Sequence, residues 1–294
     1  MLPFSPRQLQ VFAAIARTGS VSAAAQQMHL SQPAASMALG QLEQALGQPL
    51  FDRAPRQLVI NSRGRELLPQ AEDILSRLDA FGKSLDGGPI TGELRLGTSN
   101  TVGNYCVAEL LGRFVSEHPQ VRIKVEIDNT DQVVAEILAQ QLDVACVEDS
   151  PHDPELVVWP WRQDSLAVCV GPDHHLARRK RLRPNDLGGA RWILREPGSA
   201  TRRHSERILA QLPAGQTVLE LSQTEAIKQA AIAGLGMALL PRVAVEGSAA
   251  HGQLAILPTP FLDLERPLSI VVHSRRYRSH ALHAFLATID RSLV

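Results

Sequence analysis

Apolar residues recur at steps of three and four over the first fifty positions, a spacing that predicts helices. We expect a first helix over residues 5–17. Two shorter helices are predicted between Ser20 and Gly47, joined by a tight turn, and Ser31 is expected to cap the second. The buried positions of that second helix are Ala35, Leu39, Leu42 and Leu46.

Two helices joined in this way can place the second helix in the major groove of DNA. The exposed N-terminal end of that helix then faces the bases. Its candidate groove-facing residues are Ser31, Gln32, Pro33, Ser36 and Met37. An ordinary helical hairpin is the alternative interpretation of this segment when it is taken alone.

A short β-hairpin is predicted directly after these helices, over residues 50–61. It carries Arg53 and Arg56, whereas residues 31–47 contain no lysine or arginine. Because basic side chains supply many of the contacts to DNA phosphates, we expect these two arginines to make them. The 30 basic and 30 acidic residues of the whole chain balance, but residues 1–65 hold six arginines against two acidic residues.

A helix of 24 residues is predicted over residues 62–85 and would be about 36 Å long. Its apolar residues follow one another at steps of four and three, which is a heptad pattern: Leu67, Ala71, Ile74, Leu78, Phe81 and Leu85. This pattern predicts self-association, with packing on the helix's own domain as the alternative. Pro69 is expected to kink or interrupt the helix.

After a predicted hinge at residues 86–89, strands alternate with helices, which indicates an α/β domain with parallel strands. A first βαβαβ unit is expected from strands 93–97, 121–127 and 143–147 and helices 105–118 and 130–141. A second unit is expected from strands 166–170, 192–194, 218–221 and 237–240 and helices 201–211 and 224–233. A strand at 268–273 and a helix at 280–289 are expected to return to the first unit.

Four polar turns directly follow predicted strands, at residues 98–101, 129–130, 196–202 and 222–224. In an open parallel sheet, ligands bind beyond the carboxyl ends of the strands, where the following helices begin. Hydroxyl groups and backbone amides at helix starts, with Arg202 one turn into a helix, are typical of an anion site. Helix capping is the alternative explanation for each turn taken singly.

The N-terminal motifs resemble the DNA-binding domain of LysR-type transcriptional regulators. Residues 24–36 follow the order AA-x-x-M-x-L-SQ-P-A-x-S, and residues 42–56 follow LE-x-x-LG-x-PLF-x-R-x-x-R. One departure is Met37, because the family often has a basic residue there. The departure leaves phosphate contacts to Arg53 and Arg56, with Arg7 and helix amides as further candidates.

The resemblance extends over essentially the whole chain. The segments LGTSNTVGNY and REPGSATR are most similar to the branch with regulators of carbon fixation and sulfur metabolism, although Ala200 stands where the family more often has glycine. The resemblance implies a two-lobed effector domain, similar to periplasmic binding proteins. The effector contacts that it implies are Ser99, Asn100, Thr101, Thr130, Ser199, Thr201, Arg202 and Thr224.

The expected architecture is a winged helix-turn-helix domain over residues 1–61, a linker helix and hinge over 62–89, and an α/β effector domain over 90–294. Within the effector domain we expect lobe I at residues 90–162 and 266–294, and lobe II at residues 163–265. The expected partners are double-stranded DNA, a small anionic effector, further copies of the chain as a homodimer or homotetramer, and RNA polymerase. No cofactor, metal or membrane contact is expected, and a cytoplasmic location is predicted.

An α/β enzyme or a solute-binding protein with an unrelated helical head is the alternative function. Against an enzyme, the chain has no GxGxxG after a strand, no GxxxxGK[ST] and no GxSxG motif. Cys106, Cys146 and Cys169 have no metal-ligand spacing and are expected to be reduced core residues. The pair His174 and His175 lies in a polar segment and is interpreted as a solvated loop.

Overall fold

The structure is a computed structural model that describes residues 3–54, 57–83 and 88–291. It divides into two compact units, one of residues 1–89 with 276–280 and the other of residues 90–275 with 281–294. We describe each unit by itself.

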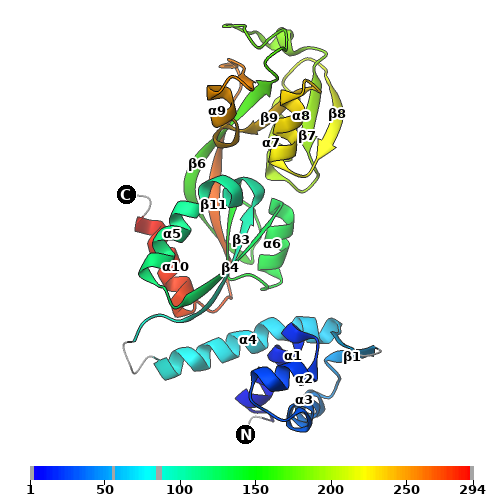
Figure 1. The fold of residues 1–294 in the computed structure, drawn as a ribbon, viewed down its shortest axis with the longest axis vertical. Helices are drawn as coiled ribbons and strands as arrows, with labels where there is room; N and C mark the ends of the chain where they lie inside the picture. Colours follow the sequence, from blue (N-terminus) through cyan, green and yellow to red (C-terminus); the bar gives the residue numbers. More distant parts are fainter. Residues whose placement is uncertain (1–2, 55–56, 84–87, 292–294) are drawn as a thin grey trace. The chain divides into compact units, whose positions relative to one another are not determined.

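The N-terminal unit contains four helices and a hairpin, in the predicted order (Figure 1). Its elements are α1 (Pro6–Thr18), α2 (Val21–Gln27), α3 (Gln32–Leu46), β1 (Phe51–Ala54), β2 (Gln57–Ile60) and α4 (Ser62–Lys83). Serine side chains cap the first three helices. Ser20 Oγ accepts from the amide of Ala23 at 3.4 Å, and Ser31 Oγ accepts from that of Ala34 at 3.3 Å. Local sequence therefore defines where these helices begin.

The core of this unit lies between α1, α3 and the start of α4. The rings of Phe12 and Phe51 meet edge to face, with centroids 5.8 Å apart. The predicted inner face of α3 is buried at Ala35, Leu39 and Leu42, and Leu46 is partly buried. This packing holds α3 with its opposite face outward.

Helix α4 runs through Pro69 as one helix, so the predicted interruption there is wrong. Pro69 is buried, and Ala71 beside it packs in the same core. Burial of this stretch against α1 outweighs the one hydrogen bond that proline removes. The second half of α4 differs from the first, because Ile74, Leu78 and Phe81 remain 42%, 45% and 76% exposed.

The second unit is built on a nine-stranded sheet with the order β4-β3-β5-β11-β6-β9-β7-β8, and β10 pairs with β6. Its strands are β3 (Gly92–Ser99), β4 (Val121–Asp128), β5 (Val144–Glu148), β6 (Leu156–Val170), β7 (Arg191–Arg195), β8 (Gln216–Leu221), β9 (Met237–Pro241), β10 (Ala255–Ile256) and β11 (Glu265–His273). Strand β3 pairs in parallel with β4 and β5, and β7 pairs in parallel with β8 and β9. Two parallel groups thus define two lobes, as predicted.

The long strands β6 and β11 connect the two lobes (Figure 1). Residues 265–273 pair with residues 156–165, and residues 268–271 also pair with β5. Strand β11 therefore returns to the first lobe as predicted. The sequence prediction missed the first ten residues of β6, because Pro160 and the polar run after Trp161 interrupt the apolar pattern.

Helices cover the sheet in both lobes. They are α5 (Ala108–Glu117), α6 (Thr130–Leu138), α7 (Ala200–Leu209), α8 (Thr224–Ile232), α9 (Arg242–Ala250) and α10 (His280–Arg291), with a 3₁₀ turn η2 (Pro184–Leu187). The predicted helix over residues 105–118 is divided, because a π-helical turn η1 (Val102–Cys106) precedes α5. Helix α9 was not predicted.

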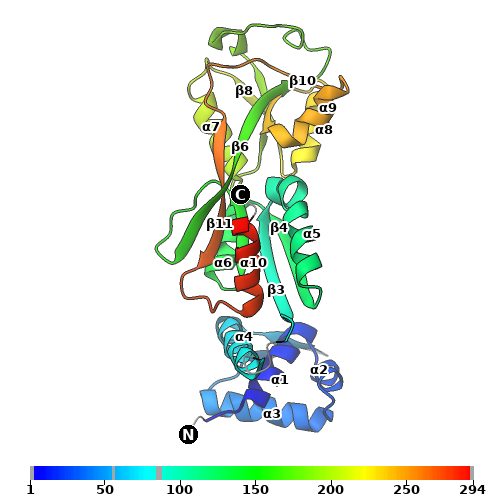
Figure 2. The same cartoon turned by 90° about the vertical axis from the view of Figure 1, so that its left-hand side faces the viewer.

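The core of the first lobe lies between the sheet and the helices α5 and α10, which run side by side (Figure 2). Phe114 of α5 and Phe285 of α10 meet edge to face with centroids 5.3 Å apart. Trp192 and Leu239 belong to the corresponding core of the second lobe. In the part of the chain that the structure describes, no helix is long and apolar enough to cross a membrane.

Candidate functional site

Polar residues that the sequence places after different strands are brought together where the two lobes meet. They are Ser99, Asn100, Thr101, Thr130, Ser199, Thr201 and Thr224, and none is more than 5% exposed. Burial of so many polar side chains has to be balanced by hydrogen bonds or charges. Most of these partners fall into two groups, one around Arg266 and one around Arg195, whereas Ser199 caps α7 by accepting from the amide of Arg202.

Arg266 of β11 is fully buried and contacts both lobes. Its Nη1 donates to Thr201 Oγ1 at 2.8 Å, and its Nη2 donates to Thr101 Oγ1 at 3.4 Å. Its Nε and Nη2 lie 2.8 and 2.6 Å from Asp164 Oδ2. Its Nη2 also lies 3.7 Å from Glu148 Oε1. One cation thus connects threonines of both lobes and two carboxylates.

Glu148 ends β5 and is buried beside Arg266. Thr130 donates to its Oε2 at 3.3 Å, and the hydroxyls of Ser99 and Thr101 also hydrogen-bond the carboxylate. Burial alone raises the pKa of Glu148, but the positive charge of Arg266 and these hydrogen bonds outweigh it. The pKa therefore lies below its usual value, and Glu148 is ionised at neutral pH.

Arg195 forms the second group at the end of β7. Its guanidinium makes a two-point ion pair with Glu196, with N–O distances of 2.7 and 2.8 Å, and its Nη1 donates to Thr224 at 3.3 Å. Arg202 is directed elsewhere than the sequence suggested. It pairs with Glu206 at 2.6 Å and Glu220 at 2.8 Å, so two carboxylates already balance its charge.

Further contacts join α6 of the first lobe to the start of α7 in the second. Arg203 Nη1 lies 2.6 Å from Asp131 Oδ1, and the amide of Asp131 donates to Gly198 O at 3.1 Å. Gly198 has a φ of +91°, and a Cβ there would lie 3.1 Å from the side chain of Asn129. Glycine at this position thus allows the two lobes to approach closely.

The predicted DNA-facing residues lie together at the exposed start of α3. All five, Ser31, Gln32, Pro33, Ser36 and Met37, are exposed. The backbone of Arg53 lies in β1, whereas its side chain and the whole of Arg56 are outside the described residues. The start of α3 therefore presents all five predicted residues to solvent.

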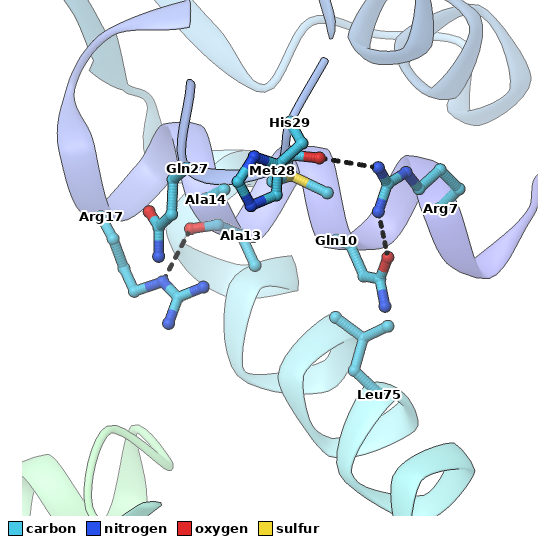
Figure 3. A pocket seen from close by; sticks show the side chains of 9 residues that line it. All are labelled: Arg7, Gln10, Ala13, Ala14, Arg17, Gln27, Met28, His29 and Leu75. Carbon is cyan, nitrogen blue, oxygen red and sulfur yellow. Dashed lines mark hydrogen bonds between the residues drawn. The ribbon is translucent and has the colours of Figure 1, made fainter. Parts of the chain in front are cut away.

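The N-terminal unit also has a hollow of about 410 Å³ between α1, the turn after α2 and Leu75 of α4 (Figure 3). Arg7 and Arg17 lie at its edge, around a floor that includes Ala13 and Ala14. Arg7 donates to Met28 O at 3.0 Å and to Gln10 Oε1 at 3.3 Å. The Arg7 side chain therefore also braces the turn between α2 and α3.

The cysteines are free thiols, with Cys146 and Cys169 buried and Cys106 partly buried, whereas His175 is exposed. Burial raises the pKa of Cys106 to about 11 and that of Cys169 to about 12, so both thiols stay protonated at neutral pH. The rings of His174 and His175 lie 4.4 Å apart, and burial lowers the pKa of His174. Among the described residues, no group of three or more His, Cys, Asp and Glu side chains is placed to hold a metal ion.

A helix-turn-helix unit with an exposed second helix, joined to a two-lobed unit with a polar interior, defines a DNA-binding transcriptional regulator with a ligand-binding domain. The chain belongs to the LysR family. Residues 6–65 match the bacterial regulatory helix-turn-helix proteins of the lysR family, and residues 87–293 match the LysR substrate binding domain. The family consists of transcriptional regulators, which excludes the enzyme alternative.

Full-length relatives agree with this assignment. The chain is 35% identical to the HTH-type transcriptional regulator YeiE of Escherichia coli over 285 residues, covering 97% of this chain and 96% of the relative. It is 33% identical to CbbR of Rhodospirillum rubrum over 286 residues, covering 96% and 94%.

Solved structures show the same fold. Full-length OxyR from Pseudomonas aeruginosa superposes with a TM-score of 0.78 at 22% identity, covering 97% of this chain and 94% of that one. The regulatory domain of CcmR from Synechocystis gives a TM-score of 0.64 at 25% identity, covering 69% of this chain and 97% of that one.

The central residues Arg266, Glu148 and Asp164 were not predicted as site residues. A signal for Arg266 was present, because it shares one face of β11 with the buried Leu268, Ile270 and Val272. A single arginine in phase with a buried apolar face indicates a buried ion pair. The expected strand began at residue 268, which left Arg266 outside it.

Proposed function

We propose that this regulator binds duplex DNA through α3 and the hairpin, and binds a small anionic effector between its two lobes. The main support for an effector site between the lobes is that buried hydroxyls from both lobes converge on Arg266. The CcmR regulatory domain was solved in complex with 2-PG, which supports an anionic class of ligand. We propose the predicted boundaries for the domains: residues 1–61, 62–89 and 90–294.

The proposed effector contacts are the predicted ones, with Arg266 as the central cation. Three helices begin at this place, α6 at Thr130, α7 after Ser199 and α8 at Thr224, and their N-terminal amides favour anions. We propose that Ser99, Asn100, Thr101, Thr130, Ser199, Thr201 and Thr224 contact the effector directly. Arg202 is kept in this set because it lies in the first turn of α7. Its side chain itself is paired with two glutamates.

We propose that the exposed apolar side of α4 pairs two copies, and that two dimers form a tetramer. Effector binding between the lobes then shifts the spacing of the DNA-binding units and the bend of the DNA. An effector shifts this balance only by its difference in affinity for the two arrangements. We also propose contact with RNA polymerase and a cytoplasmic location.

Replacing Gln32 with alanine is expected to relax sequence preference, because Gln32 lies at the exposed start of α3. The specific complex with the promoter DNA of its own gene should lose about 1–3 kcal/mol, while affinity for shuffled DNA stays unchanged.

Arg53→Ala should weaken binding to both the promoter fragment and the shuffled fragment, and should lower the slope of log affinity against log salt by about 1. Fluorescence anisotropy at several salt concentrations measures both effects.

The matched control is Gln44→Ala, an exposed glutamine at the other end of α3. Its sequence preference should equal that of the unchanged protein. An equal loss on promoter and shuffled DNA for Gln32→Ala would contradict a base-reading role.

Replacing Thr201 with valine is expected to weaken effector binding roughly 5- to 100-fold, because it removes a hydroxyl that bonds Arg266 across the lobes. Inorganic phosphate, sulfate and 2-phosphoglycolate are the probes, and isothermal titration calorimetry is the measurement. Thr217→Val on β8 is the control, since Thr217 is exposed and lies near the amino end of that strand. Unchanged affinity in Thr201→Val would place the effector outside this cleft.

A further inference from the structure

The carboxylate of Glu148 lies among the groups that are expected to hold the effector. Thr130 donates to its Oε2 at 3.3 Å, and Ser99 Oγ accepts from the amide of Glu148 at 3.3 Å. Thr101 Oγ1 accepts from the same Nη2 of Arg266 that lies 3.7 Å from the Glu148 carboxylate. All three hydroxyls are proposed effector contacts. A carboxylate that lies among three hydroxyls next to an arginine has the surroundings of a bound anion.

The backbone helps to hold Glu148 in this position. Glu148 is the last residue of β5, and its amide donates to Ser99 Oγ at 3.3 Å. Thr130, which donates to its carboxylate, is the first residue of α6. The positive end of this helix dipole therefore lies close to the carboxylate and favours its ionised form.

The charges around Arg266 disfavour the addition of a second anion. Arg266 already contacts the carboxylates of Glu148 and Asp164, and all three side chains are at least nine-tenths buried. An anionic effector beside Arg266 would meet two negative charges and one positive charge in a region of low dielectric. Repulsion between like charges is strong under such conditions.

We propose that Glu148 is an internal competitor that occupies the anion position of the effector cleft. This inference rests on the proposed function and adds a mode of regulation to the same site. An effector with a compact oxyanion or carboxylate group takes over the hydroxyls of Ser99, Thr101 and Thr130 as Glu148 is displaced. The gain from the new bonds is reduced by the bonds that Glu148 loses, so Glu148 sets the effector concentration at which the regulator responds.

The competitor role predicts that neutralising Glu148 strengthens anion binding. In Glu148→Gln, which keeps the shape and removes the charge, sulfate and inorganic phosphate should bind at least about tenfold more tightly. Isothermal titration calorimetry on the full-length protein, in a buffer without other oxyanions, gives the dissociation constants. The control is Glu246→Gln, an exposed glutamate on α9, which should match the unchanged protein.

A second variant tests the position directly. Glu148→Ala removes the carboxylate, so acetate should occupy the gap and raise the melting temperature of this variant in a saturable way. The unchanged protein should show no comparable rise with acetate. Because stability itself is the readout, the test also works for a variant that is less stable than the original.

Three results would overturn the proposal in distinguishable ways. Equal affinity of Glu148→Gln and the unchanged protein would refute the competitor role and leave the effector site in place. Weaker affinity in Glu148→Gln would instead make Glu148 an acceptor for a donor group on the ligand. Absence of oxyanion binding in every variant, together with no acetate effect in Glu148→Ala, would refute both the competitor role and the anionic effector.

Discussion

Replacing Arg266 with methionine is expected to destabilise the effector unit by about 3–5 kcal/mol, the usual loss when one partner of a buried ion pair is removed. Methionine fills much of the same volume, but it leaves the carboxylates of Glu148 and Asp164 buried without their cation. The threonines that bond Arg266 from both lobes also lose a donor. Urea unfolding followed by tryptophan fluorescence reports on this unit, because all three tryptophans lie in it.

The pH dependence gives the Arg266→Met prediction a second test. In the original protein the pKa of Glu148 is lowered, so its contribution to stability is present at neutral pH and is lost as pH falls through the folded-state pKa. Without Arg266, burial raises the pKa of Glu148 instead, and protonation of Glu148 then removes its uncompensated charge from the interior of the variant. The stability difference between the two proteins should therefore shrink as pH falls, first through the raised pKa of the variant and then below the usual glutamate value of about 4.5.

Arg242→Met is the control for the loss of one arginine, since Arg242 is exposed and its Nε donates only at 3.3 Å to Ser165. Its stability should lie within about 0.5 kcal/mol of the original. A loss below about 1 kcal/mol in Arg266→Met would contradict the central role given to this ion pair.

Replacing Phe81 with aspartate is expected to reduce affinity for promoter DNA by roughly 10²–10⁴-fold. Phe81 is 76% exposed on α4, in line with Ile74 and Leu78. A charge within the apolar face of α4 prevents the burial of that face against a second copy, and the two DNA-binding units are then no longer linked through α4. Sedimentation velocity measures the association state, and anisotropy with a two-site promoter fragment measures the affinity.

Ser76→Asp introduces the same charge on the same helix, about half a turn away from the apolar face. It should change neither the association state nor the affinity for the two-site fragment. Phe81→Asp should still bind a single half-site as tightly as the original protein. Retained dimers and unchanged affinity in Phe81→Asp would assign this face of α4 another role.

The elements of the N-terminal unit were predictable because short-range chemistry defines them. Ser20 and Ser31 satisfy amides three residues onward in the same chain, and the apolar positions of α3 follow from the helical period. Pro69 is the exception, because packing on α1 keeps α4 continuous where local preference predicts an interruption. Contacts between α1 and α4 therefore decided that α4 is continuous.

The buried polar cluster where the lobes meet was predicted in part. Its hydroxyl residues follow strands in the sequence, and the rule for parallel sheets places such residues at one edge. Strand β6 was predicted only in its last third, since its first ten residues are held by pairing with β11 and not by an apolar pattern of their own. Arg266 was missed because the predicted strand began at residue 268, so the alternation of Arg266 with the buried residues of β11 was not used.

The sequence by itself therefore determined the family, the helix starts, the alternation of strands and helices, and the hydroxyl residues that follow the strands, because each depends on neighbouring residues or on regular spacing. Only the tertiary structure decided that Arg266 joins Thr101 to Thr201 and that Glu148 is buried beside Arg266. Arg266 lies 65 residues from Thr201 and 165 from Thr101 along the chain. A guanidinium and two hydroxyls so far apart in sequence contact one another only after the fold has brought them together and excluded water.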